Sequence, residues 1–216
     1  MKVEIWSDVV CPWCYIGKRR FERALEQFAA RDEVEITYRS FELNPQAKGD
    51  DGTDLATRLA RKYGVSVEEA RAMNQRVVDA AAGEGLEYHL DIARPGNTFD
   101  AHRLLHLAES DGKQLDLKER LMKGYFTEGR SIGDPETLAG IAAEVGIDPG
   151  RTREVLASDE FADAVRRDER EAAELGISGV PFFVFDRRFG VSGAQPPEVM
   201  AGALQHAWSE REAATA

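Results

Sequence analysis

The sequence predicts an α/β protein in which two mixed segments, one at each end of the chain, build a single sheet around a large inserted block of helices. Three observations carry this prediction. Residues 2–41 alternate like strands on both sides of a helical stretch, residues 44–176 are helical in character, and strand-like residues return after position 180. With 216 residues, 43% of them hydrophobic, the chain is long enough to bury a real core.

The N-terminal segment predicts a βαβ unit. KVEIWS, residues 2–7, alternates apolar and charged side chains as a strand does, and VEITYRSF, residues 34–41, alternates again. Between them, YIGKRRFERALEQFAA places Ile16, Phe21, Leu25 and Phe28 near one face of a helix. Two strands joined through a helix are expected to lie parallel, with a right-handed crossover.

Residues 46–176 are expected to form an inserted, all-helical domain. LATRLARKYG follows the helix-starting stretch GDDGTD, and Ser66 and Glu69 make a capping box before the next helix. Further helical stretches are DAHRLLHLAES, KERLMKGYFTE, PETLAGIAAEVG and SDEFADAVRRDEREAAELG, with glycine and proline between them at RPGN and IDPG. The sequence predicts no strand in this region.

The C-terminal segment predicts a ββα unit. PFFVF, residues 181–185, and FGV, residues 189–191, are typical of an antiparallel hairpin with a turn at DRR. A last helix is expected after Gln195, with proline in its first turn. We therefore expect residues 1–45 and 177–210 to form one discontinuous domain, and residues 211–216 to be a frayed tail.

Composition excludes several kinds of function. A formal charge of −11 argues against nucleic acid, because nothing would neutralise a run of phosphates, and it argues weakly against anionic membranes. No segment approaches the roughly 20 consecutive apolar residues of a membrane helix. The N-terminus MKVEIWSDVV does not have the pattern of a signal peptide, so a cytoplasmic location is expected, where thiols are kept reduced.

Both cysteines of the chain stand in CPWC, residues 11–14, and this spacing has three interpretations. A zinc site would need two more ligands, and of the histidines only His102 and His106 form a spaced pair, four apart on a helix. The full set of histidines is His89, His102, His106 and His206. A structural disulfide around so short a loop would contribute only about 2 kcal/mol. A redox pair is the favoured interpretation, and no metal is expected.

The position of the pair supports redox chemistry. Cys11 follows a strand and precedes a helix that has Pro12 at its favoured first position. Unpaired amides and the positive end of the helix dipole would lower the pKa of Cys11 and make it the nucleophile. Cys14, one turn further along, would be the more buried, resolving thiol. Lys18, four residues after Cys14, is a candidate cation for its thiolate.

These motifs resemble a known family. SDVVCPWC at the end of a first strand, with GVPFFVF opening a later one, resembles the thioredoxin superfamily, and the helical block between them resembles its DsbA-like branch. CPWCYIGK, NTFDAHRL and SGVPFFVF are similar to the FrnE-type subgroup of that branch. The resemblance spans essentially the whole chain. It implies a thioredoxin-like βαβ…ββα fold with a large all-helical insertion.

The resemblance also implies roles for single residues. Pro181 matches the cis-proline of the family, and Val180 matches the residue whose backbone pairs with an extended thiol substrate. By itself, the sequence equally allows Pro181 simply to begin a strand. Pro12 and Trp13 are expected to contact the substrate, with Trp13 supplying a stacking surface.

A second set of residues carries alternatives that the sequence leaves open. Asn97, Thr98 and His102 match a motif that lines the groove in relatives; otherwise Asn97 or Thr98 caps a helix and His102 is solvated. Many superfamily members have a buried acid six residues before the nucleophile, where this chain has Ile5. Asp8 could replace that acid through water, but capping of the helix is the preferred interpretation.

The predicted function is disulfide reduction or isomerisation, in which Cys11 forms a mixed disulfide with the substrate and Cys14 resolves it. No cofactor is expected beyond the redox pair. The expected partners are thiol or disulfide proteins, or small thiols such as glutathione, a candidate co-substrate. One alternative is a glutathione-dependent isomerase or transferase of the 2-hydroxychromene-2-carboxylate isomerase or kappa type, which uses serine or a similar residue in place of Cys11. Another is a holdase that binds clients and leaves the thiols idle.

Overall fold

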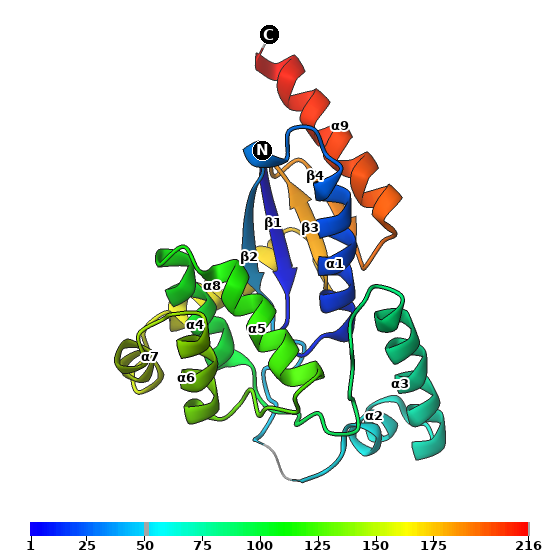
Figure 1. Ribbon diagram of the computed structural model, residues 1–216, viewed down its shortest axis with the longest axis vertical. Coiled ribbons are helices and arrows are strands. Elements are labelled where there is room, and N and C mark those ends of the chain that lie inside the picture. The colour runs from blue at the N-terminus through cyan, green and yellow to red at the C-terminus, as the bar shows by residue number, and fades with distance from the viewer. Residues whose placement is uncertain (50–51, 216) are drawn as a thin grey trace.

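The structure, a computed structural model, describes residues 1–49 and 52–215 and contains one sheet over that part of the chain (Figure 1). Its strands are β1 (Lys2–Ser7), β2 (Glu35–Ser40), β3 (Phe182–Phe185) and β4 (Phe189–Ser192). They lie in the order β2-β1-β3-β4, with β2 parallel to β1 and β3 antiparallel to both β1 and β4. The predicted parallel βαβ unit and the predicted C-terminal hairpin are both confirmed.

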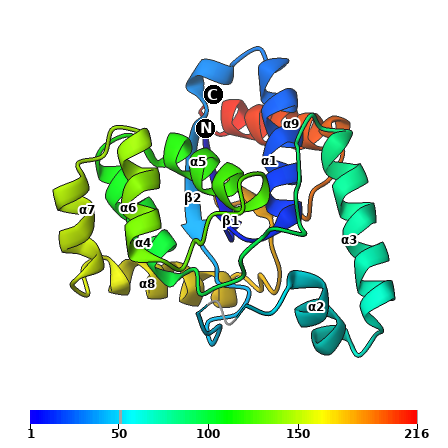
Figure 2. The ribbon, with the colours of Figure 1, turned by 60° about the horizontal axis from the view of Figure 1, so that its bottom comes forward.

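The helices account for the rest of the architecture. They are α1 (Pro12–Glu26), the short 3-10 helix η1 (Arg31–Glu33), α2 (Leu55–Tyr63), α3 (Val67–Ala82), α4 (Phe99–Ser110), α5 (Gln114–Phe126), α6 (Pro135–Glu144), α7 (Pro149–Leu156), α8 (Ala162–Glu174) and α9 (Pro197–Thr215). In Figure 2 the inserted helices form two groups, α2 with α3 on one side of α1 and α4 to α8 on the other. None of the described helices has the length and apolar character that crossing a membrane requires.

One face of the sheet packs on α1 and α9. Val3 and Ile5 alternate onto this face and are at most 2% exposed. The same core takes in Phe21, Phe28, Phe183, Phe185, Met200 and Leu204. The rings of Phe21 and Phe183 lie 5.4 Å apart, so α1 is held directly on β3. Each such buried side chain contributes roughly 1.5–3 kcal/mol relative to an exposed one, and together they fix the position of α1.

The other face of the sheet packs on the inserted helices, mainly α8. Trp6 is fully buried there, and its indole Nε1 donates a hydrogen bond of 2.9 Å to the backbone oxygen of Asp168 on α8. Glu4, also on this face, is 1% exposed and pairs with Arg39 and Arg187. A charge this deeply buried is tolerated because both arginines bond to it. Because the side chains of β1 alternate between the two faces of the sheet, this one strand packs against α1 on one face and against the helical block on the other.

Several predicted details can now be compared with the structure. The capping box of Ser66 and Glu69 is confirmed in both of its halves. Asp54 caps α2, whereas residues 50 and 51 of the same GDDGTD stretch lie outside the described residues. The structure continues α9 through residues 211–215, and the fraying predicted for this tail stays a prediction. Residue 216 lies outside the described part. The domain boundaries at residues 45/46 and 176/177 stay a prediction.

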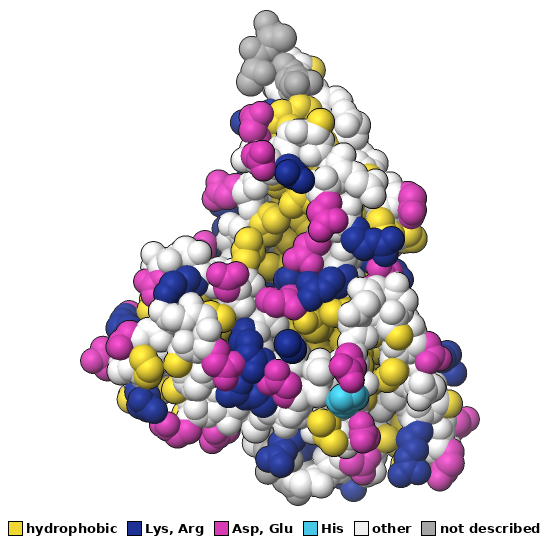
Figure 3. Space-filling view, viewed as in Figure 1, with side chains coloured by type: hydrophobic (Ala, Val, Ile, Leu, Met, Phe, Trp, Pro, Cys, Tyr) yellow, Lys and Arg dark blue, Asp and Glu magenta, His cyan; other side chains and the backbone are white. Residues whose placement is uncertain are grey.

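Charged side chains around Glu119 tie α1 to α5. Glu119 accepts a hydrogen bond of 2.5 Å from the hydroxyl of Tyr15, lies 2.6 Å from the Nζ of Lys18, and also pairs with Arg19. Both of these cations share Glu22 as a second partner. Figure 3 shows acidic and basic side chains interleaved over the part of the surface that α1 and α5 form. The helix that carries the cysteines is therefore anchored electrostatically as well as by its apolar face.

Replacing Glu119 is expected to remove part of the acid sensitivity of the fold. Burial raises the pKa of Glu119, but the hydrogen bond from Arg19 and the charge of Lys18 outweigh it and bring the pKa down to about 2. Such a carboxylate stabilises the fold above its unfolded pKa, and this contribution is lost as the pH falls from about 4.5 towards 2. We expect Glu119→Gln to lower the free energy of unfolding by about 1–2 kcal/mol at neutral pH, after allowing for solvent screening of a partly exposed group. Near pH 2 the same substitution should change it by almost nothing. Urea unfolding across this range measures the difference, and a cost independent of pH would contradict it.

Candidate active site

The two cysteines lie where β1 gives way to α1. Cys11 occupies the N-cap position and Pro12 the first position of the helix, as predicted. The backbone amide of Cys14 donates to the backbone oxygen of Cys11 at 3.0 Å, which closes the first turn. Both thiols are free, and the residues are only 4% and 2% exposed. The two sulfurs are neighbours on one helical turn, the arrangement that a reversible disulfide needs.

The chain far along the sequence completes the surroundings of Cys11. Its Sγ lies 3.6 Å from the backbone oxygen of Val180, and the Val180–Pro181 peptide bond is cis. Gly17 explains how Pro181 fits against α1: a Cβ at position 17 would come 3.0 Å from the Cγ of Pro181. A larger residue there would push the proline loop away from Cys11. The CPWCYIGK motif contains this glycine, but only the packing shows why a glycine is needed there.

An apolar pocket of about 320 Å³ opens beside Cys11. Its lining includes Pro12, Trp13 and Val180, three of the residues predicted to contact the substrate. The other residues around it are Val10, Leu43, Leu55, Leu59, Lys62, Tyr63, Met73, Asn74, Val77, Leu90, Tyr125 and Phe126. Trp13 is 44% exposed at this opening, and Cys14 is not part of the lining. Only the first of the two sulfurs therefore faces space that a ligand could enter.

The three residues that were predicted to line a groove around the start of α4 lie away from this pocket. Asn97, Thr98 and His102 do not line the pocket beside Cys11. The Oδ1 of Asn97 accepts a hydrogen bond of 2.8 Å from the amide of Phe99, so Asn97 acts near the start of α4. Thr98 stands at the N-cap without a side-chain cap bond. The alternative of a solvated His102 is wrong, because α4 packs it completely into the core.

Asp8 is a buried acid and not a helix cap. Its carboxylate accepts a hydrogen bond of 2.8 Å from the amide of Leu43 and lies 3.3 Å from the Nε2 of His102. Burial raises its pKa, but the interaction with His102 and the bond from Leu43 outweigh this and lower it overall. The preferred capping interpretation is therefore wrong, since the side chain turns inward to α4. Asp8 supplies the buried negative charge that Ile5 cannot.

The two thiols influence each other, and the surroundings shift their pKa values in opposite directions. The hydrogen bond that Cys11 makes to Cys14 raises the pKa of Cys11, burial raises it further, and the backbone amide of Cys14 offsets only part of this. Burial raises the pKa of Cys14 too, but the hydrogen bond from Cys11 and the charge of Lys118 lower it overall. The two thiols are therefore one coupled pair that shares a proton through the bond between them.

The cation that lowers the pKa of Cys14 is Lys118 on α5, not the predicted Lys18. The Nζ of Lys18 is taken up by Glu22 and Glu119, at 2.5 and 2.6 Å. Lys118 is fully buried, and the sequence does contain a signal for it. Lys118, Leu121, Met122 and Tyr125 stand at the i, i+3, i+4 and i+7 positions of one helical face. A lysine in an otherwise apolar stripe indicates a buried charge.

The remaining histidines do not form a metal site. Among the described residues, no three His, Cys, Asp or Glu side chains come together as metal ligands. His106 lies 3.1 Å from Asp168 and 3.2 Å from the hydroxyl of Ser40, where it joins α4, α8 and β2. His102 contacts Asp8 instead. The two histidines that are four residues apart on α4 therefore have different partners.

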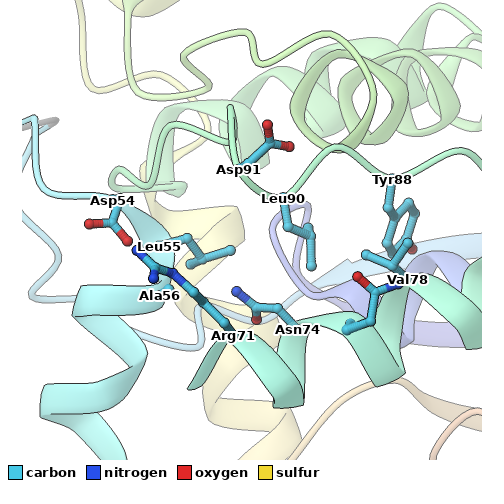
Figure 4. Close-up of a pocket in the computed structure, with 10 residues that line it drawn as sticks. Asp54, Leu55, Ala56, Arg71, Asn74, Val78, Tyr88, Leu90 and Asp91 are labelled. Atoms are coloured by element: carbon cyan, nitrogen blue, oxygen red, sulfur yellow. The ribbon is translucent and has the colours of Figure 1, made fainter. Parts of the chain in front are cut away.

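A second pocket, of about 440 Å³, lies next to the first (Figure 4). Leu55, Asn74 and Leu90 line both. In Figure 4 the side chain of Arg71 points toward Asp54 at one end of this pocket, and Tyr88 lies at the other. Neither cysteine lines it, so the larger cavity is not where sulfur chemistry can start.

Comparison with known proteins agrees with this geometry. A family model described as a DsbA-like thioredoxin domain matches residues 2–205. The chain belongs to the DsbA-like thioredoxin family. The fold expected from the quoted motifs is confirmed.

Solved structures give the same result. A probable DsbA oxidoreductase from Streptomyces coelicolor is 51% identical, covers 97% of this chain and 91% of its own, and superposes with a TM-score of 0.93. The cytosolic disulfide reductase DsbM from Pseudomonas aeruginosa, solved with GSH, is 16% identical over 95% of this chain and 98% of its own, with a TM-score of 0.67. A 2-hydroxychromene-2-carboxylate isomerase is 13% identical over 100% of both chains, with a TM-score of 0.70. The last two show likeness of fold alone.

Proposed function

We propose that this DsbA-like protein is a thiol–disulfide oxidoreductase that reduces or isomerises disulfides through Cys11 and Cys14. The observation that carries the proposal is the asymmetry of the pair: Cys11 lines a pocket and lies 3.6 Å from the backbone oxygen of Val180, whereas Cys14 is closed off behind it. The name of the Streptomyces relative, a probable DsbA oxidoreductase at 51% identity, supports the same chemistry.

The steps follow from where the proton and charge lie. A substrate disulfide enters the pocket, the proton of Cys11 passes to Cys14, and the sulfur of Cys11 attacks one substrate sulfur. The first substrate thiolate leaves and takes up the proton from Cys14. The Cys14 thiolate then attacks the sulfur of Cys11 and releases the second substrate thiolate, which is protonated from solvent. In sum, the pair gives two electrons and one proton, solvent gives the second proton, the substrate becomes two thiols, and the protein keeps a disulfide.

Location and direction belong to the same proposal. A cytoplasmic protein works among reduced thiols, so reduction or isomerisation is favoured over net oxidation. The name of DsbM, a cytosolic disulfide reductase, supports this choice only at the level of the shared fold, because the identity is 16%. The substrates we propose are disulfide-containing proteins, with small thiols such as glutathione to recycle the pair.

A glutathione-dependent isomerase or transferase is the second candidate. It is favoured by the full-length structural match to a 2-hydroxychromene-2-carboxylate isomerase. Against it stands Cys14, because a buried thiol whose pKa is lowered by its neighbours is suited to resolving a mixed disulfide and has no task in an isomerase that uses one residue to activate glutathione. The holdase alternative makes use of the apolar pocket but leaves the acidic thiol without a role.

Cys14→Ser is expected to trap the intermediate. The variant keeps the sulfur that faces the pocket but loses the thiol that resolves the mixed disulfide, so substrates should stay bound to Cys11. Incubation with oxidised protein and oxidised glutathione, followed by non-reducing gels and mass spectrometry, identifies what is attached. Adducts with proteins support the proposal, and adducts with glutathione alone favour the second candidate. If neither forms, while the Cys11→Ser, Cys14→Ser double variant behaves identically, the proposed function is wrong.

A further inference from the structure

Two pockets meet beside the cysteines, and one polar side chain belongs to both. The pocket of about 320 Å³ beside Cys11 and the second pocket of about 440 Å³ share three lining residues, which are Leu55, Leu90 and Asn74. Both volumes lie within the range of about 300–1,000 Å³ that is usual for ligand sites. Asn74 is the polar member of the shared set. A ligand that is too long for the first pocket therefore passes Asn74 on its way into the second.

The helix α3 explains why Asn74 reaches both pockets. Arg71, Asn74 and Val78 lie at the i, i+3 and i+7 positions of one helical face, and this face lines the second pocket. Met73 and Val77 belong to the neighbouring face, which lines the first pocket together with Asn74. In Figure 4 Asn74 stands on α3 between Arg71 and Val78. Its side chain therefore lies at the boundary of the two faces, where the pockets join.

The carboxamide of Asn74 is half-buried and has hydrogen-bonding capacity to spare. It makes no hydrogen bond to any other residue that the structure describes. Gln75, the next residue, offers the contrast, because its carboxamide donates to Asp79 at 2.8 Å. A carboxamide has one acceptor oxygen and two donor hydrogens, so it can bond to the N–H and the C=O of one backbone residue at the same time.

Another carboxamide of this protein already binds an extended backbone in this way. Gln114 on α5 pairs with the open side of the edge strand β2. Its Oε1 accepts a hydrogen bond of 2.8 Å from the amide of Tyr38, and its Nε2 donates one of 3.0 Å to the backbone oxygen of the same residue. A substrate chain that lies extended beside Cys11 leaves backbone groups of the same kind unpaired. Asn74 is placed to bond to them.

We propose that the second pocket is a subsite of the active site for polypeptide substrates, and that Asn74 holds the substrate backbone where it passes from one pocket to the other. This inference rests on the proposed function, because it concerns the substrates of the same cysteines. Besides Asn74, the polar residues that line the second pocket are Asp54, Arg71, Gln75 and Asp91. Such a lining accepts a hydrated peptide segment, whereas the mainly apolar first pocket accepts a side chain next to the substrate disulfide. A disulfide of two small thiols does not need Asn74.

The first test compares a substrate that has a backbone with one that has none. The reduced protein is oxidised either by hydroxyethyl disulfide or by the disulfide-linked dimer of a peptide of about ten residues, which spans about 33 Å when extended. The peptide has one central cysteine. In both reactions the protein dithiol becomes a disulfide and the substrate becomes two thiols. We expect Asn74→Ala to lower the second-order rate constant for the peptide about three- to tenfold, and that for hydroxyethyl disulfide less than about twofold.

Gln75→Ala is the matched control. It removes a carboxamide from the neighbouring position, but this carboxamide is already bonded to Asp79 and lines the second pocket alone. We expect both rate constants to stay within about twofold of their unaltered values.

Methylation of the peptide nitrogens next to the cysteine, one at a time, tests the contact with the backbone. At the position that Asn74 contacts, the methylated peptide should react about three- to tenfold more slowly with the unaltered protein. It should lose nothing further with Asn74→Ala, because both changes remove the same interaction. Full additivity of the two losses at every methylated position contradicts the contact.

Binding without chemistry separates this inference from the proposed function. The same peptide with serine in place of its cysteine cannot exchange, so its affinity, measured by the fluorescence anisotropy of a label on the peptide, depends on the pockets alone. Asn74→Ala should weaken this affinity about three- to tenfold. Asn74→Asp, an isosteric change that removes the donor, is the second variant if the first does not fold.

Two results overturn the inference: an equal loss of rate for both disulfides, or unchanged peptide binding in a folded variant of Asn74. If the unaltered protein exchanges with neither disulfide, the proposed function fails, and the binding of the serine peptide still decides on Asn74.

Discussion

Cys11→Ser is expected to abolish disulfide reduction, with a loss on the order of 10³-fold or more, as removal of a catalytic nucleophile causes elsewhere. Cys11 is the sulfur that lines the pocket, and a serine hydroxyl neither ionises near neutral pH nor exchanges with a disulfide. The rate of reduction of a disulfide-bonded protein, with reduced glutathione present for recycling, measures the effect. The mutated side chain is nearly isosteric and can still donate to the backbone oxygen of Val180.

Two controls make this result specific. The melting temperature of Cys11→Ser should match that of the unaltered protein, which shows that the loss is chemical. Cys14→Ser should keep the first half of the reaction and lose only turnover, because the sulfur that lines the pocket remains. If Cys11→Ser reduces disulfides at the normal rate, Cys11 is not the attacking residue, and the asymmetry of the pair has another meaning.

Asp168→Ala is expected to cost the fold about 3–5 kcal/mol, the range for removing one partner of a buried charge network. The carboxylate of Asp168 accepts a hydrogen bond of 2.8 Å from the amide of Ser40 on β2 and lies 3.1 Å from His106 and 3.5 Å from Arg39. Alanine would leave the buried amide of Ser40 without its acceptor and would remove one partner each from His106 and Arg39. Urea unfolding, monitored by far-ultraviolet circular dichroism, measures the loss.

The same helix provides the comparison for this variant. Asp163→Ala, at an exposed position in the first turn of α8, should cost no more than about 1 kcal/mol, the value of a favourable helix-dipole contact. Asp168→Asn should lie between the two, because its amide oxygen can still accept from Ser40. Equal costs for Asp163→Ala and Asp168→Ala would mean that the charge network does not hold α8 on the sheet.

The fold could be predicted because its signals are local. Alternation in residues 2–7 and 34–41, helical periodicity from 44 to 176 and the return of strand character at PFFVF all reflect which side chains neighbour each other along the chain. The capping box at Ser66 and the start of α1 at Pro12 are local in the same sense. The position of Cys11 after a strand and before a helix followed directly from these patterns.

The roles of the polar residues around the cysteines could not be predicted in this way. Asp8 is of a residue type that often caps helices, yet its carboxylate contacts His102, 94 positions away. Lys18 had the right spacing from Cys14, yet carboxylates on α1 and α5 occupy it. His102 was expected at a groove or in solvent and lies in the core. The partners that decide these roles, His102 for Asp8 and Glu119 for Lys18, are distant in sequence and meet their residues only in the folded chain.

The sequence by itself determined the order of the elements, the sheet-and-helix class and the pair of cysteines at a helix start, because propensity and periodicity act within a few residues. Only the tertiary structure decided which sulfur faces a pocket and which lies closed off behind it. Packing brings α5 and Lys118 to Cys14, and Val180 to Cys11, across more than 100 positions of chain. Acidity depends on burial and on charges within a few ångströms, and those exist only once the helical block has closed on the sheet.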